Sequence, residues 1–227
     1  YRTADALFNG AAVANVITSC IPAFKDPWQI STADLDTLLI SIRMASYGHE
    51  MDFTSTCPKC EEISDFGIDL RTILESVSMP DYSKPVVNGD VSIHFKPLSY
   101  KEQNDNNLVQ FQNQKMLESL PQSDLPEEEK LQKIQEAFTN ISVLTLNAIA
   151  DRIAMIKAGD DIVVDKTHIK EYLQNCDNKH FDKIRKKIEY IKEVSEIKPL
   201  HITCDKCQHK YETPFTLNVA NFFASGS

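Results

Sequence analysis

The sequence predicts a mainly helical α+β protein in which two cysteine-bearing hairpins enclose a long helical insertion. Three observations lead to this class. Helical periodicity recurs along most of the 227 residues. Two Cys-x-x-Cys pairs, at 57–60 and 204–207, each stand between short strand-like segments. The residues between the pairs have mostly helical patterns, so the two hairpins lie far apart in sequence.

Two helices are predicted before the first cysteine pair. Apolar residues over 3–19 suit a buried helix that is interrupted near Asn9-Gly10. Ser31 or Thr32 can cap a second helix, because a hydroxyl oxygen accepts hydrogen bonds from the free amides of the first turn. This helix is expected to run to about Ser46.

The segment that follows is predicted to alternate between strands and turns. Short strands flank the first cysteine pair, and Asp69 can cap a short helix through Leu74. The Asn88-Gly89 pair predicts a tight turn between extended segments at 85–87 and 91–95, because both residues tolerate positive φ.

Two long helices are predicted in the middle of the chain. The first begins near Ser99, with Glu102 at the capping-box position. Residues 119–130 contain two prolines and four acids, which indicates an exposed connection. A helix over about 127–149 is expected to bury one apolar side, formed by Leu131, Ile134, Phe138, Ile141, Leu144 and Leu146.

The last third of the chain returns to short strands. Further strands are expected at 153–157, 162–164, 200–203 and 210–217, with helices at 167–176 and 178–195. We therefore divide the chain into an N-terminal helical segment, a first cysteine hairpin, an inserted mostly helical domain, and a second cysteine hairpin with a C-terminal tail. Their bounds are 1–50, 51–70, 71–198 and 199–227.

Composition and charge exclude several classes of protein. The net charge of −9 disfavours binding to nucleic acid and to anionic lipid. The one dense basic segment, residues 179–192, is interrupted by acids, which favours a solvated helix face. No apolar run approaches the ~18 residues needed to span a bilayer, so no membrane insertion is expected. The first five residues do not match a secretory signal, and the cysteine pattern indicates a reducing compartment.

The four paired cysteines predict one structural zinc ion, bound by Cys57, Cys60, Cys204 and Cys207. Zinc prefers thiolates in a tetrahedral arrangement, and one Cys-x-x-Cys turn presents two sulfurs. The flanks also match, because Ser-Thr-Cys-Pro-Lys-Cys in the first pair corresponds to Ile-Thr-Cys-Asp-Lys-Cys in the second. The result is a zinc-ribbon-like pair of hairpins with a long helical insertion, whereas usual ribbons separate their pairs by about 15–20 residues.

Other interpretations of the cysteines stay open at this stage. Each pair could form a local disulfide or a redox-active dithiol. A site completed by His49, His201 or His209, or by a second chain, is a further alternative.

The remaining reactive residues favour structural roles. Cys20 and Cys176 lie in apolar, helix-like surroundings and are expected to be buried as small hydrophobic residues. The histidines at 94, 168 and 180 are isolated and are expected to lie on the surface or to be packed. The sequence contains no phosphate-binding, dinucleotide-binding or metalloprotease motif, so we expect no catalytic residue, no bound organic cofactor and no small-molecule substrate.

Several segments together resemble one family of proteins. They are residues 6–10, 17–21, 34–49, the Cys-Pro-Lys-Cys turn and 66–70. The most specific is Leu-Leu-x-x-Ile-Arg-x-x-x-Tyr-Gly, over 38–48, followed by the first cysteine pair. Over about residues 6–110, and more loosely beyond, the chain resembles the small baseplate hub proteins of T-even-type contractile-tailed bacteriophages.

The resemblance implies a non-enzymatic virion or tail-assembly component, located in the tail baseplate and assembled in the cytoplasm of the bacterial host. Its implied partners are other phage tail and baseplate hub proteins, and a ring of its own copies is left open. The aromatic residues of the stretch 219–223 are expected either to anchor a partner or to close the protein's own core. The alternative functions are a zinc-ribbon nucleic-acid-binding factor and a thiol-disulfide protein.

Overall fold

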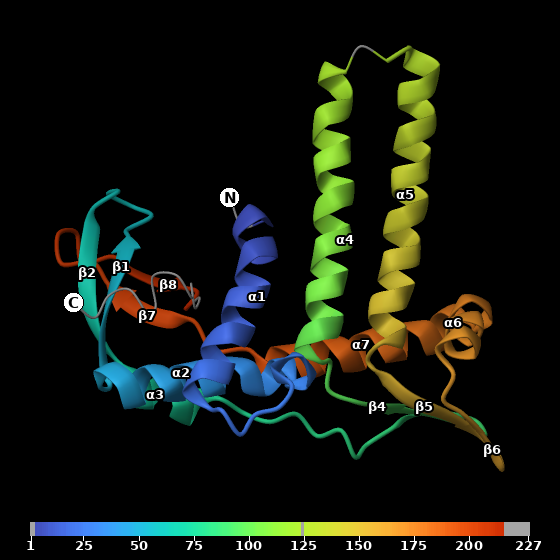
Figure 1. Cartoon of the computed structure of the whole chain (residues 1–227), viewed down its shortest axis with the longest axis horizontal. Helices are drawn as coiled ribbons and strands as arrows, with labels where there is room; N and C mark the ends of the chain where they lie inside the picture. Colours follow the sequence, from blue (N-terminus) through green and yellow to red (C-terminus); the bar gives the residue numbers. More distant parts are fainter. Residues whose placement is uncertain (1–2, 124, 216–227) are drawn as a thin grey trace.

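The computed structural model describes residues 3–123 and 125–215. Helices hold far more of these residues than strands do, which confirms the mainly helical α+β class. The molecule is elongated, with two small β-hairpins at one end, a mixed helix-and-sheet body at the other, and a long helical hairpin that projects from this body (Figure 1). The predicted aromatic stretch 219–223 lies outside the described residues.

The first helix, α1, runs without a break from Thr3 to Cys20, so the predicted interruption at Asn9-Gly10 is wrong. Gly10 is buried where α1 meets α4, and the Tyr100 hydroxyl donates to its carbonyl oxygen at 3.2 Å. A Cβ at Gly10 would lie 2.6 Å from Asn104 Oδ1. The glycine therefore permits the close approach of two helices and does not end one.

The second helix, α2 (Thr32–Tyr47), confirms the capping prediction. The Ser31 side chain accepts from the Ala33 amide, and Gly48 ends the helix with φ +88. A short 3-10 helix, η1 (Pro27–Gln29), precedes it. The buried residues that join α1 to α2 are Val13, Ile17, Ile30, Leu39 and Ile42.

A four-stranded antiparallel sheet forms the far end of the molecule. Its strands are β3 (Val86–Asn88), β4 (Val91–Phe95), β5 (Ile153–Ala158) and β6 (Asp161–Val163), side by side in that order. The turn between β3 and β4 lies one residue later than predicted, at Gly89-Asp90, because Asn88 already pairs with Val91. Gly89 has φ +59, a conformation that costs glycine little.

Two helices, α6 (Lys166–Asn175) and α7 (Asn178–Ser195), pack against this sheet and form the largest core. Each begins with an aspartate cap, because Asp165 and Asp177 accept from amides of the first turn. The core residues are Ile93, Phe95, Ile149, Ala150, Ile153, Ile156, Ile169, Leu173, Ile184 and Ile191.

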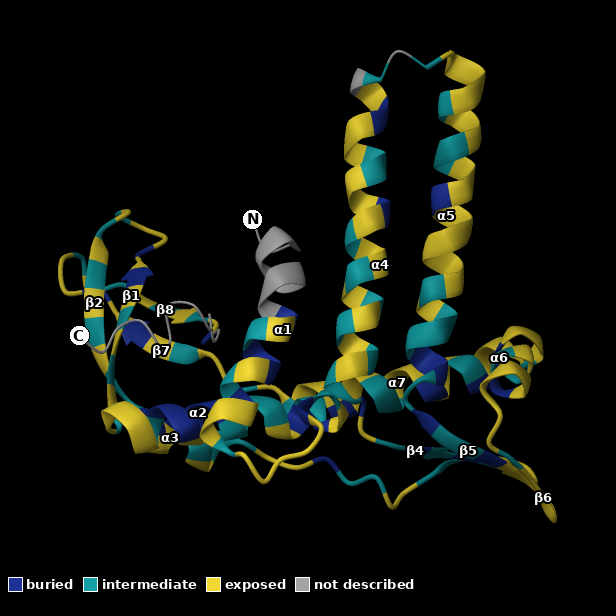
Figure 2. Cartoon of the chain, in the orientation of Figure 1, coloured by how far each residue is buried: buried dark blue, intermediate teal, exposed yellow. Residues whose placement is uncertain are grey.

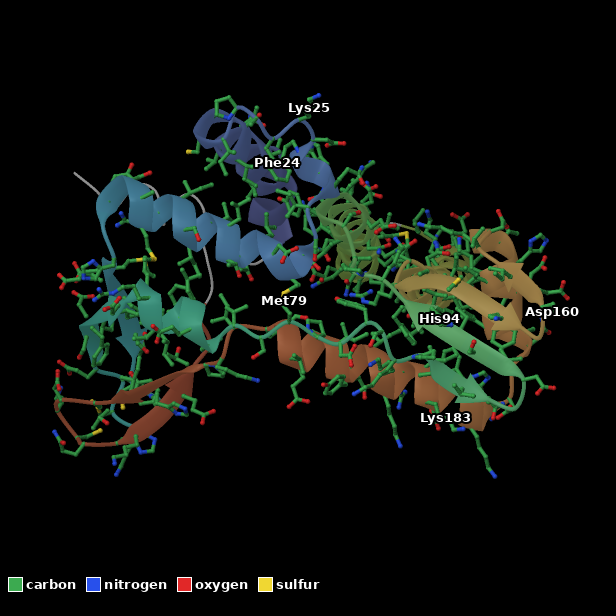
Figure 3. The ribbon with its side chains drawn as sticks, turned by 90° about the horizontal axis from the view of Figure 1, so that it is seen from below. Phe24, Lys25, Met79, His94, Asp160 and Lys183 are labelled. Atoms are coloured by element: carbon green, nitrogen blue, oxygen red, sulfur yellow. The ribbon has the colours of Figure 1, made fainter. Side chains whose placement is uncertain are left out.

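The described chain passes twice between the two hairpins at one end of the molecule and the sheet at the other. One of these passages is α7, and the other is the irregular segment 77–85, on which Met79 lies (Figure 3). The Lys187 ammonium donates to the Asp81 carbonyl oxygen at 3.0 Å, so the segment is fastened to the helix.

The projecting hairpin consists of α4 (Tyr100–Ser119), η2 (Leu120–Gln122) and α5 (Glu127–Ala150). The capping box predicted at Ser99 and Glu102 is present. At the base of the hairpin, Lys166 Nζ lies 3.1 Å from Glu102 Oε1 and 2.7 Å from Asp151 Oδ1. These contacts connect α4, the end of α5 and the start of α6.

The predicted burial of the apolar side of α5 is wrong over most of its length. Leu131, Phe138 and Ile141 are exposed, and Ile134, Leu144 and Leu146 are half-buried (Figure 2). Away from its base, α5 has α4 as its neighbour, so a narrow stripe that includes Ala137 is enough to cover their contact. The predicted exposed connection is also shorter, because Leu120 is buried.

Candidate metal centre

The first cysteine pair lies in the turn between β1 (Glu50–Thr56) and β2 (Ile63–Asp69). The two strands pair along their whole length, and Thr56 opposite Ile63 closes the ladder. Asp69 then caps the short helix α3 (Leu70–Ser76), as predicted. The hairpin is thus held between α2 and α3, which fixes the position of its turn.

Hydrogen bonds shape this turn around the first thiol. The Cys57 amide donates to the Glu62 carbonyl oxygen at 2.9 Å, and the Glu61 amide donates to the Cys57 carbonyl oxygen at 2.9 Å. Glu61 adopts φ +57, a left-handed conformation that is uncommon outside glycine. Backbone strain of this kind persists where the surrounding structure requires it.

The second pair repeats the same turn between β7 (Leu200–Thr203) and β8 (Lys210–Thr213). The Cys204 amide donates to the His209 carbonyl oxygen, and the Gln208 amide to the Cys204 carbonyl oxygen, both at 2.9 Å. Gln208 also has φ +57. The two predicted hairpins are therefore similar in backbone conformation, and the two hydrogen bonds of one turn have counterparts in the other.

The structure brings the four predicted cysteines into one cluster. Their ligand atoms all lie within 4.8 Å of one another. Cys57 Sγ is 3.7 Å from Cys207 Sγ, and Cys60 Sγ is 3.6 Å from Cys204 Sγ. A zinc ion with bonds of ~2.3 Å to four sulfurs in a tetrahedron separates them by about 3.8 Å. None of these thiols is in a disulfide bond.

Burial and charge also suit a cation at this position. Cys57 and Cys204 are each only 1% exposed. Burial raises the pKa of the Cys57 thiol, but the amides of Cys60 and Lys59 outweigh it and lower the pKa to about 7. The Glu62 amide lowers the pKa of Cys60, but burial and the neighbouring thiols together outweigh it and raise the pKa to about 12. Clustered thiols therefore resist joint ionisation, and a divalent cation removes that resistance.

Contacts that the sequence did not indicate hold the two hairpins together. Lys206 forms an ion pair with Glu62, and the Tyr211 hydroxyl donates to Ser55 Oγ at 3.1 Å. The rings of Phe53 and Phe215 lie 6.3 Å apart. Phe215 also belongs to a buried core with Ile40, Leu70 and Ile73. Each contact joins residues of the two separate hairpins or their flanks, so no local pattern could reveal them.

Two of the three histidines considered as alternative ligands, His201 and His209, have other neighbours. The His201 ring lies 3.4 Å from Glu212, and the His209 ring stacks on Tyr211. Within the described residues, the metal-competent cluster consists of the four cysteines.

Two lone cysteines behave differently from each other. Cys20 is exposed at the end of α1, so its predicted burial is wrong. Cys176 is half-buried, and its thiol donates to the Leu173 carbonyl oxygen at 3.5 Å. His180 is packed in the core, with its Nδ1 2.6 Å from the Tyr172 hydroxyl.

Among the described residues, no helix is both long and apolar enough to cross a membrane.

Comparison with known proteins identifies the family. Neither a curated protein nor a solved structure matches the chain. The family model described as "T4 bacteriophage base plate protein" matches residues 4–224, which is nearly the whole chain and confirms the resemblance found in the sequence. The chain therefore belongs to the family of T4 bacteriophage base plate proteins.

Proposed function

We propose that the chain is a non-enzymatic structural or assembly component of the baseplate hub, and that one zinc ion bound by Cys57, Cys60, Cys204 and Cys207 stabilises it. One observation carries the proposal. Two hairpins more than 140 residues apart present four thiols at tetrahedral spacing, in a chain that matches the baseplate family. Family membership supports a place in the tail baseplate of a virion, in contact with other baseplate proteins.

A structural role for zinc is supported by the composition of the site. Four thiolates complete a tetrahedral shell and leave no position for a reacting water, whereas a catalytic zinc keeps one position open. The ion would close a loop of 144 residues between Cys60 and Cys204. Closing a loop of this size removes about 5 kcal/mol of unfolded-chain entropy in the simple polymer model, comparable with the whole stability of a small domain.

The position of the site explains why such a cross-link is useful to an assembly protein. The cysteine hairpins belong to segments 51–70 and 199–227, which flank the inserted domain proposed at 71–198. In the structure, α7 leads directly from the sheet-containing body into β7. A metal joining β7–β8 to β1–β2 would thus fix the body relative to α1 and α2, and would hold the surfaces presented to neighbours in one arrangement.

The baseplate role is tested in the assembled particle. Phage that lack this gene are complemented with the wild-type chain, with Cys60→Ser, or with Cys20→Ser as the control at an exposed thiol. We expect wild type and Cys20→Ser to restore tails, and Cys60→Ser to reduce baseplate assembly severely. Cross-linking of intermediates should join the chain to hub proteins.

Two results would contradict the baseplate role in the proposed function. One is normal assembly in the absence of the chain. The other is specific binding of single-stranded nucleic acid at physiological salt without any association with tail intermediates. A catalytic turnover by the purified chain would contradict its non-enzymatic part.

A further inference from the structure

An apolar stripe runs along one flank of α5, next to the side that faces α4. Leu131 is 58%, Phe138 62% and Ile141 41% exposed, although these are among the largest apolar residues of the helix. Together with Ile134 and Thr145 they occur at alternating spacings of three and four residues, which places them on one side of the helix. We call these five residues the α5 stripe.

The remainder of the described chain leaves four of the five stripe residues exposed, and only Ile134 is half-buried. Beside the stripe, α5 faces α4, where Ala137 and Asn113 are buried. The hairpin projects away from the body, so the helices of the core lie at its base (Figures 1 and 2). An exposed stripe with this spacing is the seam that a further helix covers in bundles and coiled coils.

The absence of charge on the stripe allows a partner identical to this chain. Residues 137–150 contain no charged side chain, and the stripe itself contains none. The chain carries a net charge of −9, so most pairs of surfaces from two copies repel each other. An uncharged stripe removes this repulsion where two copies meet, and like charges across an interface would otherwise cost several kcal/mol.

The area of the hairpin face also fits a dimer. The helix α5 has 24 residues, which corresponds to about 36 Å. Two helices side by side are about 20 Å wide. The face therefore offers roughly 700 Å² per copy, close to the ~800 Å² that each partner contributes to a stable interface of standard size.

From these observations we propose that the α4–α5 hairpins of two copies of the chain pack through their α5 stripes into a four-helix bundle. A twofold axis brings the same stripe from each copy together, so one set of residues completes both sides of the interface. The proposal is independent of the zinc site and of the assignment to the hub.

The test compares three versions of the whole chain by sedimentation velocity over about three decades of concentration. They are the wild type, Phe138→Glu on the stripe, and Val143→Glu on the same helix. Val143 is exposed and apolar but lies five residues away, about 140° around the helix. Because all these side chains are exposed, folding should be retained, which circular dichroism checks.

We expect the wild type and Val143→Glu to form dimers, and Phe138→Glu to dissociate with a Kd raised at least ~30-fold, the effect of losing an interface hot spot. A wild type that stays monomeric while folded would overturn the proposal, even if another protein binds the stripe. The proposal would also be overturned if Phe138→Glu and Val143→Glu weakened the dimer equally, or if neither weakened it.

Discussion

The Cys57 thiol lies 3.7 Å from the Cys207 thiol, although 150 positions of sequence separate the two residues. The Cys60 and Cys204 thiols repeat the relationship at 3.6 Å. Each first cysteine of one turn therefore faces the second cysteine of the other, an arrangement expected for two similar turns that meet around one ion. The chain between the two turns leaves this cluster and returns to it, so a metal ion bound there would hold the two hairpins together.

The four ligand cysteines should be far more sensitive to substitution than the two lone cysteines. Replacing Cys60 or Cys207 by serine is expected to lower the free energy of unfolding by about 3–5 kcal/mol, because the cross-link is lost. Thermal unfolding of the zinc-loaded proteins measures this difference.

Cys20→Ser and Cys176→Ser are the matched controls. Cys20 is exposed, so its replacement should change stability by no more than about 0.5 kcal/mol. Cys176 is half-buried, so its replacement by serine should lower the free energy of unfolding by less than about 2 kcal/mol. Equal shifts of the melting temperature in all four variants would argue against a shared metal site.

The end of α2 should require a glycine at position 48, because the backbone there adopts a conformation that other residues rarely adopt. Gly48 has φ +88 and ψ 178, a region almost restricted to glycine. Gly48→Ala is expected to cost about 1–3 kcal/mol even though its new Cβ would meet open space. The control is Gly67→Ala in β2, where a Cβ also has room, and it should be neutral or slightly stabilising. Chemical denaturation that ranks the two variants the other way would contradict this explanation.

The ion pairs at the base of the hairpin should make stability depend on pH. Partial burial raises the pKa of Glu102, but hydrogen bonds from the Lys96 ammonium and the Ser99 amide outweigh it, and Lys166 adds to their effect. The pKa falls from 4.5 to about 2. The folded state thus binds fewer protons than the unfolded state between these values, so Glu102 stabilises the fold above about pH 4.5 and loses this effect as pH falls toward 2.

The variant Glu102→Gln isolates this effect, because glutamine keeps the capping-box hydrogen bond and removes only the charge. We expect it to be about 1–2 kcal/mol less stable than the wild type at neutral pH. The difference should shrink as pH falls from 4.5 to 2. A difference that stays constant over this range would show that the charge of Glu102 does not stabilise the hairpin.

Local signals in the sequence were sufficient for most element boundaries. The caps at Ser31, Asp69 and Ser99 all form, because a cap depends on a side chain and an amide only two or three residues away. The cysteine cluster was also predictable, since the two turns carry the same motif and the same flanks. The backbone of each turn follows from its own residues.

Features that depend on distant neighbours were harder to predict. The apolar residues of α5 follow a helical period, but periodicity cannot show how many partners a helix has, and α5 has one along most of its length. The Asn9-Gly10 pair resembled a helix break. The true role of Gly10 is its close contact with Asn104, which a local pattern cannot show because the two residues are 94 positions apart. The β3–β4 turn moved by one residue because the pairing of Asn88 with Val91 extends the ladder.

The most direct test of the account is the metal content of the purified chain, combined with X-ray absorption at the zinc edge. We expect about one zinc per chain, with four sulfur neighbours at ~2.3 Å. The Cys60→Ser variant should lose most of the metal, while Cys20→Ser retains it. A metal-free wild type that carries two intact disulfides within the cysteine turns, or a zinc ion with nitrogen or oxygen neighbours, would contradict the four-cysteine site.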